Sequence, residues 1–161
     1  MIIGCQVHQR WVIIKSFVIS QMKDLKKYST KDQETLQDIR LAQREHGFII
    51  PSDYVYFLMN CNGFEFDEPP IIKLGIDEYE FGEFYDLQTL VWELAHYRKM
   101  VENYNHYFWL KDYLSVGNID DHRIVIGTKP ENINEVHLYN DEEGTTVKIA
   151  DNIFVLLEMY I

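Results

Sequence analysis

The chain has 161 residues, of which 47% are hydrophobic and 14% aromatic, a composition typical of one globular domain and not of a disordered chain. Its 26 acidic residues outnumber its 15 lysines and arginines, so the formal net charge at pH 7 is −11. This charge argues against binding to nucleic acid or to an anionic membrane, because both require a basic surface. It favours a basic protein partner, although solubility alone is a simpler explanation.

The cysteines and the N-terminal segment carry little information about function. Cys5 and Cys61 are too few for a disulfide framework or a four-cysteine metal site. The apolar residues 11–19 include Lys15, are too few to span a bilayer and lack the cleavage site of a signal peptide. We therefore expect a cytoplasmic protein. Residues 1–28 fit a strand that runs into a helix or a single helix, and we assign them as an N-terminal extension packed on a domain of residues 29–161.

The first clear helix is predicted to begin at Thr30. Thr30 and Gln33 have the spacing of a capping box, and Leu36 and Ile39 begin a thin apolar stripe. Gly47 is the residue type that commonly follows the end of a helix.

The next segment has the signals of a short buried helix at both of its ends. Pro51 suits a first helical turn, and Asp53 places a carboxylate near the N–H groups of that turn. One face has the i, i+3, i+4, i+7 spacing of a buried stripe, formed by Tyr54, Phe57, Leu58 and Cys61. Asn62 and Gly63 readily adopt positive φ and end the helix.

Acidic and aromatic residues are interspersed along the following stretch, residues 65–86. From Glu65 to Asp86 there are eight acidic side chains, and Lys73 is the only cation. Within it, residues 71–76 are predicted to form a strand. The stretch is either a set of solvated loops whose aromatic rings point inward, or a surface on which rings anchor and carboxylates steer a basic partner. The candidate contact residues are Asp67, Glu68, Asp77, Glu78, Tyr79, Glu80, Phe81 and Glu83.

Asp86 is the predicted N-cap of the longest helix. The apolar stripe of that helix extends over about five turns and consists of Leu87, Leu90, Leu94, Tyr97, Val101, Tyr104 and Phe108. Such a stripe fits a helix that packs on a sheet better than a coiled-coil seam. We expect a monomer or a weak homodimer.

The last third of the chain is rich in strand signals. Residues 113–117, 122–127, 135–139 and 145–149 alternate or are continuously apolar, and short polar turns separate them. They predict antiparallel hairpins with one buried face. Asp151 is the predicted cap of a final helix over residues 153–160.

Three motifs in this order resemble the SUKH superfamily, a group of immunity and regulatory domains similar to the yeast glucan-synthesis regulator. The family's Leu-Pro-acidic-Tyr, Phe-Leu and Asn-Gly-Gly signature corresponds to residues 50–54, 57–58 and 62–64, with isoleucine for the leucine and phenylalanine for the second glycine. Its apolar strand that leads to a glycine corresponds to residues 113–118. Its Ala-Asp/Ser-Phe-x-x-Phe-Leu helix corresponds to residues 150–157, with isoleucine for the first phenylalanine.

The resemblance covers residues 32–161 and implies a single α+β domain. In such a domain N-terminal helices precede an antiparallel β-sheet meander, one long helix is inserted in the meander, and a helix closes the chain. The resemblance also implies a protein-binding function. The leading interpretation is an immunity protein that binds and neutralises a cognate toxin domain, often a nuclease; the alternative is a regulatory scaffold. The family signature does not identify binding residues.

Motifs of catalysis are absent from the sequence. The chain has no glycine-rich phosphate loop, G-x-S-x-G motif or H-E-x-x-H motif. The best candidate metal ligands are His122, His137, Asp120 and Asp121, provided that three of them converge. A histidine in an alternating strand more often faces solvent or makes one hydrogen bond. We therefore expect a protein that is not an enzyme and that has no metal and no cofactor.

Overall fold

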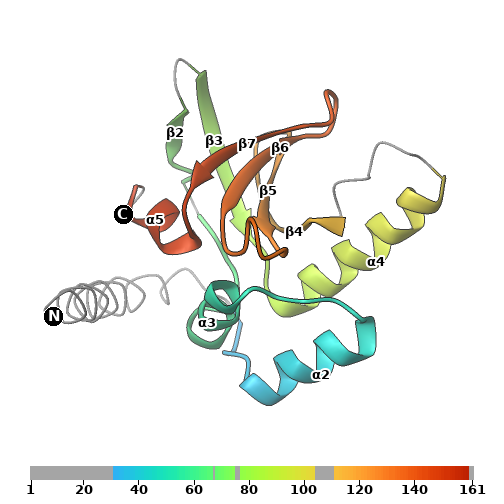
Figure 1. Ribbon diagram of the computed structural model, residues 1–161. Coiled ribbons are helices and arrows are strands. Elements are labelled where there is room, and N and C mark those ends of the chain that lie inside the picture. The colour runs from blue at the N-terminus through green and yellow to red at the C-terminus, as the bar shows by residue number, and fades with distance from the viewer. Residues whose placement is uncertain (1–30, 67, 75–76, 104–110, 160–161) are drawn as a thin grey trace, which may run out of the picture.

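The computed structural model describes residues 31–66, 68–74, 77–103 and 111–159. In this part of the chain seven strands form one antiparallel sheet, and four helices pack beside it (Figure 1). The strands are β1 (Phe64–Glu65), β2 (Ile71–Leu74), β3 (Asp77–Phe84), β4 (Tyr113–Ile119), β5 (His122–Gly127), β6 (Val136–Asn140) and β7 (Thr145–Ala150). The helices are α2 (Leu36–His46), α3 (Ser52–Asn60), α4 (Leu87–Asn103) and α5 (Ile153–Glu158).

The strand order is β1-β3-β4-β5-β6-β7, and β2 pairs with β3 outside this path. From β3 to β7 each strand pairs with the next in the chain, and α4 is inserted between β3 and β4. Helix α4 packs against β4, α5 packs against β7 and α3, and α2 packs against α3 and α4 (Figure 1). The predicted α+β domain with a meander, an inserted helix and a closing helix is therefore confirmed. The predicted extension, residues 1–28, lies outside the described residues.

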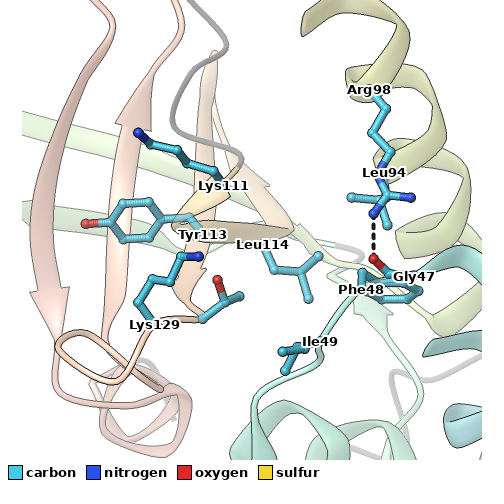
Figure 2. A pocket seen from close by; sticks show the side chains of 10 residues that line it. Gly47, Phe48, Ile49, Leu94, Arg98, Lys111, Tyr113, Leu114 and Lys129 are labelled. Atoms are coloured by element: carbon cyan, nitrogen blue, oxygen red, sulfur yellow. Dashed lines mark hydrogen bonds between the residues drawn. The ribbon is translucent and has the colours of Figure 1, made fainter. Parts of the chain in front are cut away.

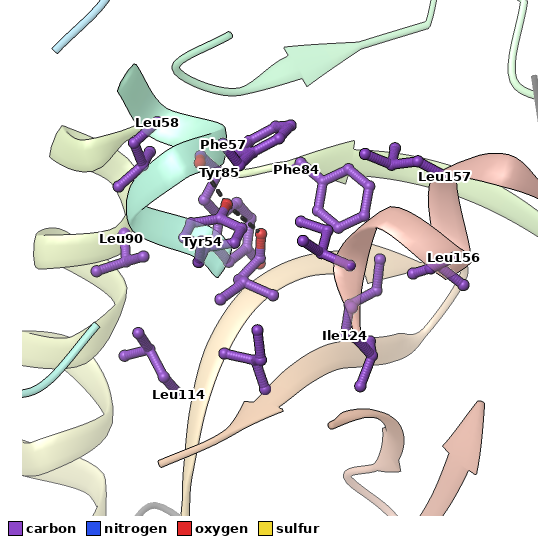
Figure 3. Packing of buried hydrophobic residues seen from close by; sticks show 14 of the residues in the cluster. Tyr54, Phe57, Leu58, Phe84, Tyr85, Leu90, Leu114, Ile124, Leu156 and Leu157 are labelled. Carbon is purple, nitrogen blue, oxygen red and sulfur yellow. Dashed lines mark hydrogen bonds between the residues drawn. The ribbon is translucent and has the colours of Figure 1, made fainter. Parts of the chain in front are cut away.

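The predicted helix α3 lies at the centre of the core. The side chains of Tyr54, Phe57, Leu58 and Cys61 are all buried, as their spacing predicted. They pack with residues of α4, α5 and the sheet, including Leu90, Phe84, Ile124 and Leu156 (Figure 3). Phe57 lies 5.5 Å from Phe84 between ring centroids. Helix α3 thus contacts α2, α5 and the sheet.

Asn62 and Gly63 follow α3 in conformations that few residue types adopt. Their φ angles are 48° and 82°. A Cβ on Gly63 would lie 2.5 Å from the backbone nitrogen of Asp86, so no side chain fits there. The side chain of Asn62 accepts from the Leu87 N–H (3.1 Å) and donates to the Asp32 carbonyl (2.7 Å). This dipeptide therefore joins the end of α3 to the start of α4 and to the segment before α2.

Helix α2 begins later than the sequence predicted. Its N-cap is Thr35, which forms a capping box with Asp38, whereas Thr30 lies outside the described residues. The residues before Thr35 bond to α3 instead: Gln33 Nε2 donates to the Asn60 carbonyl (2.7 Å). The predicted start at Thr30 was wrong because two threonines have the same capping-box spacing. The end of α2 is confirmed, since Gly47 has a φ of 63°.

Helix α4 begins as predicted. Asp86 Oδ1 accepts from the Thr89 N–H (2.8 Å), and Lys31 forms an ion pair with Asp86. Burial raises the pKa of Asp86, but the hydrogen bonds from Lys31 and Thr89 outweigh burial and hold the pKa below its usual value. The first four stripe residues are buried, whereas Val101 is 38% exposed. The last two, Tyr104 and Phe108, lie outside the described residues.

The cap of α5 is Asn152 and not Asp151. Asn152 Oδ1 accepts from the N–H groups of Phe154 and Val155, both at 3.0 Å. Asp151 instead forms an ion pair with Lys148 (2.9 Å). The helix ends at Glu158, two residues before the predicted end. Its apolar residues Ile153, Leu156 and Leu157 pack into the core.

The strand β3 was not predicted from the sequence. It pairs with β1, β2 and β4, so most of the acidic stretch is sheet and not loop. A bulge between Phe81 and Glu83 interrupts the alternation of inward and outward side chains. Because of this irregularity, the sequence of β3 does not show the continuous alternation of apolar and polar residues that indicates a strand.

No helix among the described residues is long and apolar enough to cross a bilayer.

Candidate protein-binding surface

The β2–β3 hairpin carries most of the predicted contact residues and extends away from α2 and α3 (Figure 1). Asp77, Glu78 and Glu80 are exposed on β3. Lys73 on β2 lies opposite Glu78 and forms an ion pair with it at 2.7 Å, with both side chains mostly in solvent. Glu68 is exposed in the segment that leads into β2.

Phe81 faces the core. It is 1% exposed, stacks on Phe64 with ring centroids 6.2 Å apart, and lies opposite buried Ile119 of β4. The hypothesis that Phe81 anchors a partner is therefore wrong, because successive side chains of a strand point to opposite faces. Tyr79 is half-buried, and its ring makes an edge contact with His122 at 5.3 Å between centroids.

Glu83 lies apart from the hairpin acids. It is half-buried, lies opposite Glu65 of β1 and accepts from Asn118 Nδ2 at 3.2 Å. Burial, and next the Glu65 carboxylate, raise the pKa of Glu83 above its usual value. The remaining candidate, Asp67, lies outside the residues that the structure describes.

Two further acids join the hairpin from the β4–β5 turn. The Glu80 N–H donates to Asp120 Oδ2 (2.8 Å), and the Asp120 N–H donates to the Glu80 carbonyl (2.9 Å). Asp121, the next residue, is exposed. We define the hairpin surface as Asp77, Glu78, Tyr79, Glu80, Asp120 and Asp121. The sequence offered Asp120 and Asp121 only as metal ligands, and no local pattern places them beside a strand 40 residues away in the chain.

The candidate metal ligands do not converge. The His122 ring contacts Tyr79, whereas His137 Nε2 lies 3.3 Å from Glu135 Oε2. Among the residues that the structure describes, no group of three or more His, Cys, Asp and Glu side chains is arranged to hold a metal ion. Cys61 is 1% exposed and lies in the core.

A sequence model of the SMI1 / KNR4 family (SUKH-1) matches residues 34–159, which include all the helices and strands described above. A comparison with curated proteins finds no significant match. The family match covers most of the chain and agrees with the signature residues that end α3 and begin α5. This chain therefore belongs to the SMI1 / KNR4 family (SUKH-1).

Proposed function

We propose that this protein is a cytoplasmic, non-enzymatic immunity protein that binds and neutralises a cognate toxin domain through the hairpin surface. Membership of the SUKH-1 family is consistent in general with an immunity or a regulatory role. The observation that carries the proposal is the hairpin surface itself, where hydrogen bonds between Glu80 and Asp120 join two separate segments that carry five exposed carboxylates.

Such a surface suits a basic protein partner. Carboxylates of one sign attract a basic domain from solution and accelerate its association. A nuclease domain fits this description, because it holds the phosphate backbone in a basic groove. Tyr79, which is partly exposed on β3, supplies a rigid ring of the kind that contributes strongly at interfaces.

The hairpin surface is also held in place before binding. Two hydrogen bonds between Glu80 and Asp120 join the hairpin to the β4–β5 turn, one to the Asp120 carboxylate and one between backbone groups. The Tyr79 ring packs against His122 at the start of β5. A surface that is already ordered loses less conformational entropy on association than a flexible one, which favours tight binding.

The test is titration calorimetry and stopped-flow association with the toxin domain encoded beside the gene, at two salt concentrations. The test variant carries Asp77→Lys, Glu78→Lys and Glu80→Lys. The control variant carries Glu45→Lys, Glu102→Lys and Glu131→Lys, which reverses three exposed acids on α2, on α4 and in the segment after β5. Both variants change the net charge equally, so a difference between them reports the position of the charges.

We expect the test variant to associate about tenfold more slowly and with a weaker salt dependence, and the control variant to change much less. Equal effects of the two variants would exclude the hairpin surface as the contact site. If the unaltered protein does not bind the folded toxin domain, the immunity role is excluded and the regulatory scaffold becomes the better interpretation.

A further inference from the structure

A pocket of about 280 Å³ lies between the α2–α3 connection, α4, the start of β4 and the segment after β5 (Figure 2). Phe48 and Leu94 contribute apolar side chains from the helical side, and Leu114 contributes one from the sheet. The rim after β5 is held in place, since the Thr128 N–H donates to the Asp112 carbonyl at 3.0 Å. This pocket does not include any residue of the hairpin surface.

The charge of the pocket is opposite to that of the chain. The sequence has 26 acidic residues against 15 lysines and arginines. Yet the described residues that line this pocket include Arg98, Lys111 and Lys129 and no aspartate or glutamate. Figure 2 shows Lys111 and Lys129 on the sheet side, Arg98 on the helix side, and Leu114 between them. The guanidinium of Arg98 and the ammonium of Lys129 at one hollow create a local positive potential that an anion would neutralise.

Arg98 is held firmly at the mouth of the pocket. Its Nη2 donates to the Gly47 carbonyl at 2.9 Å, and its Nη1 donates to the His46 carbonyl, both at the end of α2. A guanidinium has five N–H donors, and these two bonds use one from each terminal nitrogen. The bonds orient the charged group without neutralising it.

The lining also indicates what is attached to the anion. A bare inorganic ion would leave the partly exposed Phe48 and the exposed Ile49 of the lining in contact with water, whereas an apolar group beside the charge would cover them. The volume, about 280 Å³, is near the lower limit for pockets that enclose small molecules. It suits one small molecule or one terminal residue of a peptide.

We propose that this pocket binds a small organic anion, a carboxylate on a short apolar body. The ammonium of Lys129 and the guanidinium of Arg98 pair with the carboxylate, and the apolar body lies against Leu94, Leu114 and Phe48. The proposal is independent of the toxin-binding function. Its ligand is either a free organic acid or the C-terminal residue of a peptide, which present the same chemistry.

The test is a titration of the full-length, ¹⁵N-labelled protein followed by amide chemical shifts. The probe is 3-phenylpropionate, and its neutral control is 3-phenylpropionamide. Inorganic phosphate is the control for charge without an apolar body. The tripeptide Gly-Gly-Phe, with a free or an amidated C-terminus, distinguishes a peptide terminus from a free acid. We expect saturable shifts at Gly47, Thr128 and Lys129 with the carboxylates, and weaker binding of the amides by about tenfold.

Lys129→Gln removes a charge from the pocket, and Lys73→Gln removes one from the β2–β3 hairpin. We expect the first to weaken binding of the carboxylate by about fivefold and the second to leave it unchanged, because a charge-assisted hydrogen bond acts locally. Tighter binding of the free peptide terminus would identify a peptide as the ligand, and binding of the acid alone would identify a small molecule. The proposal would be overturned if 3-phenylpropionate did not saturate the protein, or if it bound no more tightly than 3-phenylpropionamide or inorganic phosphate. Equal effects of Lys129→Gln and Lys73→Gln on its binding would overturn the proposal too.

Discussion

At the scale of single residues, Tyr54 makes a buried polar contact in the core. Its hydroxyl lies 2.6 Å from the Tyr85 carbonyl and 2.9 Å from the Val116 carbonyl (Figure 3). Burial, and next the nearby Tyr85, raise its pKa well above the usual value, so the hydroxyl keeps its proton and remains a donor. A residue predicted only as part of an apolar stripe therefore also connects α3 to the segment before α4 and to β4.

Tyr54→Phe is expected to lower the free energy of unfolding by about 1–3 kcal/mol, because it leaves a buried carbonyl without its donor. Urea unfolding followed by circular dichroism measures the change. Tyr56→Phe on the same helix is the control, since Tyr56 is only half-buried, and it should change stability by less than about 0.5 kcal/mol. Equal effects of the two variants would show that the hydroxyl of Tyr54 contributes little.

At the scale of elements, the start of a helix depends on which of several polar residues accepts the first free N–H groups. Before α5, both Asp151 and Asn152 are residue types that cap helices. The structure selects Asn152, since Asp151 is occupied by Lys148. Before α2 the same choice falls on Thr35.

Asn152→Ala is expected to destabilise the protein by about 1 kcal/mol, because two N–H groups of α5 lose their acceptor. Asp151→Ala removes only an exposed ion pair and should cost less than about 0.5 kcal/mol. Thermal unfolding of both variants compares them directly. A larger effect of Asp151→Ala would contradict the assignment of the cap.

At the scale of the whole molecule, acidic residues from three elements meet at one side of the sheet. Glu65 of β1 lies opposite Glu83 of β3, and Glu93 of α4 also raises the pKa of Glu83. Burial raises the pKa of Glu93 too, although Arg123, at 3.4 Å, opposes this effect. The folded state therefore holds protons on Glu83 and Glu93 more tightly than the unfolded state does.

For Glu83 the consequence for stability has a definite sign. A carboxyl whose pKa is raised on folding destabilises the folded state above that pKa, and the penalty disappears below the usual value of 4.5. Glu83→Gln, which still offers an acceptor to Asn118, should therefore stabilise the protein at pH 7, and the gain should vanish near pH 4. Urea unfolding at both pH values measures this, with exposed Glu80→Gln as the control. A gain that is the same at both pH values would contradict the explanation.

The hairpin surface and the pocket show how far sequence reasoning reached. The acids Asp77, Glu78 and Glu80 were found because they are dense in the sequence, and they are exposed as expected. Phe81 was misassigned, because composition does not reveal which face of a strand a side chain occupies. The pocket was missed entirely, since Phe48, Arg98 and Lys129 come from segments that no local pattern relates.

The sequence by itself determined the family, the α+β class, the buried face of α3 and five of the strands, because these depend on spacings within a few residues. Only the tertiary structure decided that Thr35 and Asn152 begin helices, that β3 is a strand, and that Asp120 lies beside Glu80. Each of these depends on a competition between local partners and residues distant in the chain. The spacing of apolar residues in the sequence predicts which face of an element is buried, whereas the packing of the folded chain determines which side chains contact one another.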